Sequence, residues 1–191
     1  MDTIGAYLEA DHARCDALLR PARDAVRAAR WTQADEALAA FRHALERHLR
    51  VEEDILFPAF DEAMHQVRTP TAAMRGEHLR IRGMAQRLAD ALRARDAEAF
   101  LCHCDTLGVL CHQHSEKEEG VLYPVMQRLL APSAAGLVAA MREFTLEPYL
   151  EEAEAPAAPS APHHPGALAR IEVGHRRDLG IRHGTGHITH L

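Results

Sequence analysis

The sequence predicts an all-α fold, an up-and-down four-helix bundle with a short fifth helix and a disordered C-terminal tail. Ala, Leu, Arg and Glu are abundant and aromatic residues make up only 5% of the chain, which favours helix over sheet. Long amphipathic segments are joined by short connections, as in antiparallel bundles. The 191 residues carry a net charge of −6 with histidine neutral, which argues against a broad nucleic-acid-binding surface.

Start and stop signals place the helices in order along the chain. They are expected over about residues 3–29, 32–65, 70–94, 97–130 and 133–145. Thr32 and Asp96 read as N-caps of the second and fourth helices. Pro21 is expected to kink or divide the first helix, and the second and fourth are expected to be interrupted near Pro58 and Pro124.

A change of composition separates a helical domain, residues 1–148, from a Pro/Ala-rich linker and His-rich tail, residues 149–191. The tail has no sustained hydrophobic period, so we expect it to be disordered. No segment approaches 18 uncharged apolar residues and the first residues include several charges, so neither a membrane span nor a signal peptide is expected. The four cysteines show no disulfide framework, and a cytoplasmic protein with reduced thiols is predicted.

The second and fourth helices contain the same eleven-residue pattern, H-x-x-x-E-E-x-x-L-[FY]-P, beginning at His48 and at His114. Residues four apart share a helix face, so His48 lies beside Glu52 and His114 beside Glu118. Both pairs fall on the apolar face of their helix, where an unpaired carboxylate costs on the order of several kcal/mol. A bound cation would remove that cost.

The first and third helices each add one histidine on the apolar face. The predicted metal ligands, called the ligand set below, are His12, His48, Glu52, His78, His114 and Glu118. Four imidazoles and two carboxylates suit two borderline ions such as iron, with manganese or zinc as alternatives. Two glutamates can bridge two ions and leave room for water or a small diatomic ligand. No added nucleophile or organic cofactor motif is present, so no catalytic residue is assigned.

The glutamates that follow the ligands, Glu53 and Glu119, lie about 100° further around the helix. They are therefore expected to support the ligands or face solvent rather than bind metal. His112 and Glu116 also have the four-residue spacing, but their helix face is mostly polar. We therefore exclude His112 and Glu116 as metal ligands.

Other histidines and cysteines leave alternatives open. Cys15 and Cys111 each lie three residues from a predicted ligand and are interpreted as small core residues or, alternatively, as redox-sensitive thiols. Cys102 and Cys104 point to different sides of a helix and make a poor chelate. The six tail histidines belong to a disordered appendix or to a metal-loading segment.

At these residues the sequence resembles the hemerythrin-like family, also called the HHE cation-binding domain. The matching segments are Asp11-His12, residues 48–58, Glu77-His78 and residues 114–124, and the resemblance covers about residues 1–146. It implies a four-helix bundle around an oxo- or hydroxo-bridged, non-haem di-iron site (Fe²⁺/Fe³⁺). Family roles include oxygen binding, oxygen or iron sensing, nitric-oxide response and repair of iron–sulfur clusters.

Two departures from the invertebrate oxygen carriers shape the functional prediction. Arg82 stands where those proteins have a second histidine, and Glu118 replaces an aspartate one residue further on. The chain looks more like bacterial repair and nitric-oxide-responsive members. We therefore expect a protein that binds or senses O₂, NO or iron status; the alternatives are a di-iron redox enzyme acting on peroxide, NO or damaged clusters, and an inert zinc- or manganese-bound interaction unit. The sequence names no protein partner.

Overall fold

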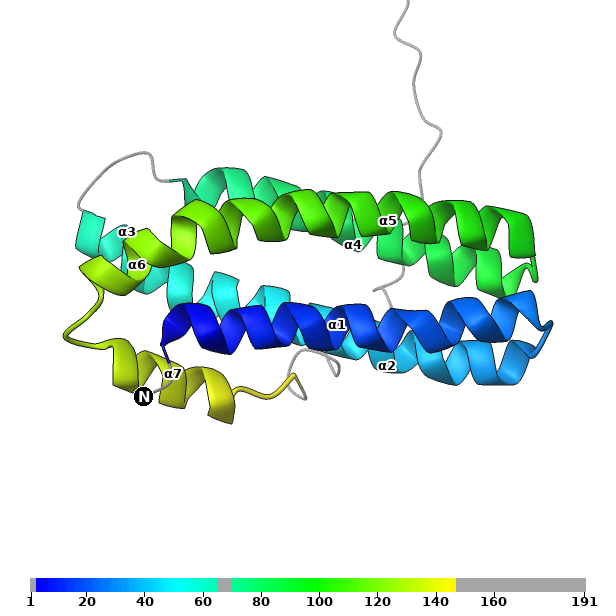
Figure 1. Ribbon diagram of the computed structural model, residues 1–191, viewed down its shortest axis with the longest axis horizontal. Helices are drawn as coiled ribbons and strands as arrows, with labels where there is room; N and C mark the ends of the chain where they lie inside the picture. Colours follow the sequence, from blue (N-terminus) through cyan, green and yellow to red (C-terminus); the bar gives the residue numbers. More distant parts are fainter. Residues whose placement is uncertain (1–2, 65–69, 147–191) are drawn as a thin grey trace, which may run out of the picture. The chain divides into compact units, whose positions relative to one another are not determined.

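Four long helices form the body of the protein, seen in a computed structural model that describes residues 3–64 and 70–146. They are α1 (Ile4–Arg27), α2 (Trp31–Val51), α4 (Thr71–Arg93) and α5 (Ala97–Lys117), and they run side by side (Figure 1). The described part of the chain contains no strand. The predicted all-α bundle is confirmed, while the proposed tail and its boundary near residue 148 lie outside the described residues.

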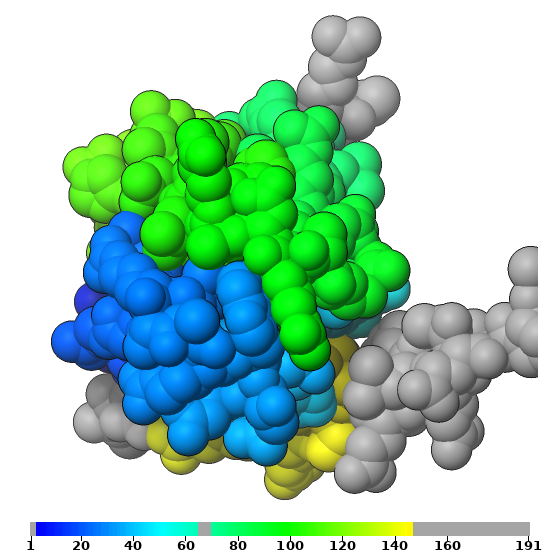
Figure 2. All heavy atoms as spheres, turned by 90° about the vertical axis from the view of Figure 1, so that its right-hand side faces the viewer, coloured from blue at the N-terminus to red at the C-terminus, as the bar shows by residue number. Residues whose placement is uncertain are grey.

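The helices pair through two matching tight turns. Ala29 joins α1 to α2 with φ 55°, and Arg95 joins α4 to α5 with φ 53°, a left-handed conformation that closes each helix pair. Figure 2 views the bundle from the end that carries these turns, with the α1–α2 pair in blue beside the α4–α5 pair in green. This connectivity brings all four long helices around one interior.

A short π-helical segment follows the second long helix of each pair. α2 continues into η1 (Glu52–Leu56) and α3 (Phe57–Met64), and α5 continues into η2 (Glu118–Leu122) and α6 (Tyr123–Leu129). In each segment the residue before the proline donates its N–H to the carbonyl five residues earlier, Phe57 to Glu52 and Tyr123 to Glu118. The next residue is proline, which lacks an N–H and crowds the preceding turn, so the helix widens instead of ending. The interruptions predicted near Pro58 and Pro124 are confirmed in this form.

One local prediction is wrong in part and another is wrong. Pro21 lies inside α1, which continues past it to Arg27, so the helix is not divided there. Thr32 is not an N-cap, because α2 already begins at Trp31 and no side chain caps its first turn. The cap at Asp96 is confirmed, since its side chain accepts the N–H of Ala99. The short fifth helix is confirmed as α7 (Ala134–Glu143).

Two hydrophobic clusters fill the interior, one on each side of a polar layer. The first contains Phe41, Leu88 and Leu107, near the tight turns, and the second contains Phe57 and Met126, near the π segments. α7 packs on the second cluster. Among the described helices, none is both long and apolar enough to span a membrane. The polar layer between the clusters holds the predicted ligands.

Candidate metal centre

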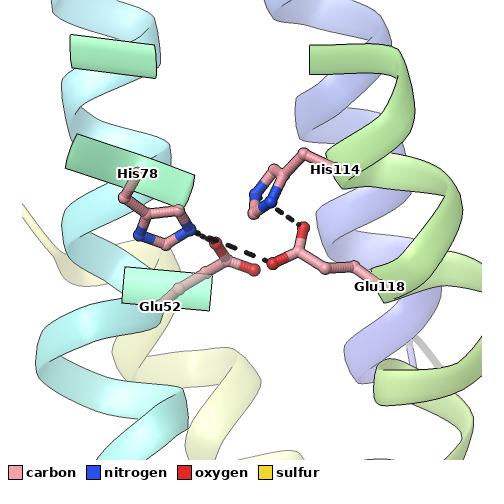
Figure 3. A group of neighbouring side chains, drawn as sticks. All are labelled: Glu52, His78, His114 and Glu118. Carbon is pink, nitrogen blue, oxygen red and sulfur yellow. Dashed lines mark ion pairs between the residues drawn. The ribbon is translucent and has the colours of Figure 1, made fainter. Parts of the chain in front are cut away.

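All six members of the ligand set meet in the polar layer. Their ligand atoms form two overlapping groups, Glu52/His78/His114/Glu118 and His12/His48/Glu118, with the atoms of each group within 4.8 Å of one another. Figure 3 shows the first group, in which Glu52 and His78 approach Glu118 and His114 from opposite sides. Five of the six side chains are buried, and His12 is partly buried. Glu118 belongs to both groups, so it lies between the two positions where cations could bind.

The Nε2 atoms of the four histidines face the two glutamates. His48 and His114 point to the carboxylates on their own helices, at 3.6 Å and 3.2 Å. His12 Nε2 lies 3.3 Å from Glu118, and His78 Nε2 lies 3.3 Å from Glu52. Local helix geometry explains the first two contacts, because residues four apart share a face. The other two require the packing of α1 against α5 and of α2 against α4.

The opposite ring nitrogen, Nδ1, of every one of these histidines faces a further carboxylate. The four contacts are His12–Glu119 at 2.7 Å, His78–Glu53 at 2.8 Å, His114–Glu77 at 3.2 Å and His48–Asp11 at 3.5 Å. A carboxylate on Nδ1 keeps the proton on that nitrogen and leaves the Nε2 lone pair free. Histidines that bind metal ions are commonly oriented in this way.

The sequence found half of these supporting carboxylates. Glu53 and Glu119 were expected to support the ligands or to face solvent, and the structure shows the first alternative, with contacts to His78 and His12. No role for Asp11 or Glu77 was predicted from the sequence. Each directly precedes a ligand histidine in the chain but contacts the histidine of a neighbouring helix, so only their repeated position could have marked them.

The buried polar atoms provide a direct test of whether the site fits cations. Within the described residues, the buried side-chain atoms without a hydrogen-bond partner are Asp11 Oδ2, His12 Nε2, both ring nitrogens of His48, Glu52 Oε2, His78 Nε2, His114 Nε2 and Glu118 Oε1. The group includes the Nε2 of every ligand histidine and one oxygen of each ligand glutamate. Buried polar atoms are normally paired, because leaving them unpaired is costly. A mixed imidazole and carboxylate donor set fits iron, manganese or zinc.

The two ligand glutamates have pKa values shifted in opposite directions. Burial raises the pKa of Glu52, but the neighbouring His48, His78 and Tyr123 outweigh it and bring the value to about 2. Burial and the charge of Glu52 hold the pKa of Glu118 well above its usual range. Two adjacent carboxylates cannot both be charged at low cost. Cations between them would remove this conflict.

A buried tyrosine joins the two carboxylates. The Tyr123 hydroxyl lies 2.6 Å from Glu52 Oε1 and 2.9 Å from Glu118 Oε2. The side chain is 1% exposed, and burial together with both glutamates holds its pKa well above 10. Tyr123 was not predicted as a site residue from the sequence, although it occupies the F/Y position of the repeated pattern.

A family model described as the hemerythrin HHE cation binding domain matches residues 3–126. The chain belongs to this family. The matched range contains the whole ligand set, and HHE domains bind metal cations, typically iron. No curated protein and no solved structure matches the chain. Cation binding in this HHE domain therefore rests on the family and on the His/Glu cluster of its own interior.

Arg82, the departure noted in the sequence, supports the His78 side of this HHE domain. Its guanidinium contacts both oxygens of Glu53, at 2.7 Å and 3.0 Å, and both oxygens of Glu46. Burial raises the pKa of Glu53, but His78 and Arg82 outweigh it and bring the value to about 2. Arg82 thus keeps Glu53 charged, and Glu53 in turn holds His78.

A small cavity of about 30 Å³ adjoins the ligand set between the long helices. Its wall includes the ligands His12, His48 and His114, the thiols of Cys15 and Cys111, and apolar side chains such as Leu45, Ile81 and Leu107. Burial is the largest cause that raises the pKa of each of the two thiols to about 12, so both remain protonated and uncharged near neutral pH. All four cysteines are free.

The excluded pair, His112 and Glu116, lies outside the site. His112 and Glu116 pair at 3.5 Å, but their side chains are 74% and 66% exposed. His114 and Glu118 are buried instead, as the hydrophobic pattern predicted. The tail histidines lie outside the described residues.

Proposed function

We propose that this HHE domain holds two iron ions, oxo- or hydroxo-bridged, and binds or senses O₂ or NO. The ligand set would supply the protein ligands, with Glu52, His78 and His114 around one position, His12 and His48 around the other, and Glu118 shared. When bound, such a centre supplies reversible Fe²⁺/Fe³⁺ chemistry. The side chains of the chain orient the donors and exclude bulk water.

The main support for a diatomic ligand is the small cavity beside the ligand set. A site for one water molecule needs about 10–15 Å³ and two to four polar partners. The cavity offers about 30 Å³, and besides its three histidines, Asp16 and Ser115 it is lined by apolar residues and uncharged thiols. A neutral molecule of two heavy atoms suits this volume and polarity better than an anion or a large substrate.

The test is metal analysis combined with optical spectroscopy. Protein purified from cells without added metal should contain iron, and the reduced form should change its spectrum when exposed to air and, separately, when exposed to NO in the absence of oxygen. His114→Ala should lose both the metal and the spectral change. Iron-loaded wild type whose spectrum responds to neither gas would refute ligand binding, and zinc or manganese in place of iron would refute the redox centre.

A further inference from the structure

The repeated pattern places an aromatic ring beneath each ligand glutamate, but only one ring carries a hydroxyl. Phe57 follows η1 and Tyr123 follows η2, each five residues after a ligand glutamate. Tyr123 stacks against His12 at 6.0 Å and 23°, and Phe57 stacks against His78 at 5.6 Å and 23°. The rings are therefore equivalent in position and differ in one oxygen atom.

The π segments explain how these rings reach the site. In an α-helix a residue five positions on lies well around the helix from the first, whereas the wider π turn returns it near the same face. Tyr123, the first residue of α6, thus lies next to Glu118 of the preceding π segment. Its ring is long enough for the hydroxyl to reach Glu52 on the opposite pair of helices as well, at 2.6 Å.

A single hydroxyl cannot serve two carboxylates equally. It carries one proton and donates it to one carboxylate at a time, and the carboxylate that accepts this hydrogen bond is held in a fixed orientation for a cation. The shorter contact is with Glu52 Oε1, so Glu52 is the favoured acceptor. Phe57, the equivalent ring of the other half, has no hydroxyl and cannot donate a hydrogen bond.

We propose that Tyr123 is a positioning residue of the metal centre, holding the Glu52 and Glu118 carboxylates toward each other and making the two cation positions unequal in affinity. The proposal rests on the proposed function only in taking these glutamates as metal ligands. It assigns the main inequality in affinity between the two cation positions, whose predicted ligands repeat along the chain, to one hydroxyl group. Phe57 provides the matched position for a control.

The experiment titrates the full chain, freed of metal, with Co²⁺ followed by visible absorption, and with Fe²⁺ under anaerobic conditions. Wild type should bind in two phases of different affinity. Tyr123→Phe should weaken the tighter phase by about 10- to 100-fold and bring the phases together. The double variant Tyr123→Phe/Phe57→Tyr, which moves the hydroxyl to the other ring, should restore two phases. Phe57→Tyr alone gives both rings a hydroxyl and should also bring the two phases together.

The outcomes separate this inference from the proposed function. Unchanged affinities and absorption in Tyr123→Phe, or a double variant that does not recover two phases, would overturn the positioning role. Wild type that binds neither cation would overturn the proposed function and this inference with it. Melting temperatures of the metal-free variants show whether each is folded, and if Tyr123→Phe is not, the double variant alone decides between the outcomes.

Discussion

The two halves of the bundle place their ligands at equal intervals but surround them differently. From His12 to His78, and from His48 to His114, the separation is the same 66 residues. The glutamates Glu52 and Glu118, and the left-handed turns at Ala29 and Arg95, keep that interval too. The surroundings of His12 and His78 differ because other positions of the repeat do not match.

On the His78 side, the supporting glutamate is shielded from solvent and held by an ion pair. Glu53, which contacts His78, is 11% exposed and is bound by Arg82. On the His12 side, Glu119 is 39% exposed, and the residue 66 positions before Arg82 is Asp16, which cannot bind a carboxylate as arginine does. His12 is accordingly 11% exposed while His78 is fully buried.

This difference shows that a sequence repeat can place the same residue types on both sides of the site while the two sides differ in exposure to solvent. The cavity adjoins His12, His48 and His114 but not His78. An exogenous ligand would therefore meet the His12 side, while the His78 side holds its geometry. The predictions below test this contrast, beginning with the change expected to have the largest effect.

The largest effect is expected from the shared carboxylate. Glu118→Ala should lose metal from both positions and Glu52→Ala mainly from one, because only Glu118 belongs to both groups of neighbouring ligand atoms. Metal bound only to the native state stabilises it, so metal content and melting temperature should fall together. Metal analysis and thermal melts measure this; unchanged metal stoichiometry in both variants would contradict the ligand assignment.

The next effect concerns the ion pair on the His78 side. Arg82→Gln should lower the free energy of unfolding of the metal-free protein by about 2 kcal/mol at pH 7, because it removes charged hydrogen bonds to Glu53. The pKa of Glu53 falls from 4.5 to about 2 on folding, so this stabilisation is present above pH 4.5 and is lost as the pH drops toward 2.

Urea unfolding at pH 7 and at about pH 2 measures this dependence. The difference between wild type and Arg82→Gln should shrink at the lower pH, where Glu53 becomes protonated in both folded proteins. The control is Arg80→Gln on the same helix, where the side chain is 66% exposed and a change within about 0.5 kcal/mol is expected. An equal loss at both pH values would show that Arg82 acts through packing instead.

A smaller difference should separate the two supporting glutamates. Glu53→Gln and Glu119→Gln each replace a carboxylate on histidine Nδ1 with a neutral amide. Changes of this kind weaken metal binding by about 10- to 100-fold, and the loss should be nearer 100-fold for the enclosed Glu53 and nearer tenfold for the more exposed Glu119. Co²⁺ titration of both variants measures the ratio, and equal losses would remove the contrast between the two sides.

The smallest effect is expected at the exposed pair on α5. His112→Ala and Glu116→Ala should leave metal content unchanged and alter the free energy of unfolding by less than about 1 kcal/mol, as for other exposed ion pairs. Metal analysis and urea unfolding check this. Loss of metal in either variant would mean that cations reach the site through this surface.

The sequence by itself determined the main helices and the side chains that meet in the polar layer. The spacing of four residues within His48–Glu52 and His114–Glu118 is a property of one helix, so it can be seen without knowing what packs against that helix. The apolar residues around those pairs then indicated which face is buried, and this correctly rejected His112. Asp96 was likewise found because a cap depends on neighbours in the chain.

Only the tertiary structure decided how these ligands are held and how unequal they are. Asp11 and Glu77 support histidines of neighbouring helices, Arg82 binds a glutamate of another helix, and Tyr123 reaches Glu52 across the bundle. Such contacts depend on the rotation and offset of each helix relative to the next. Those quantities arise from the packing of whole side chains, and a periodic pattern within one helix contains no information about them.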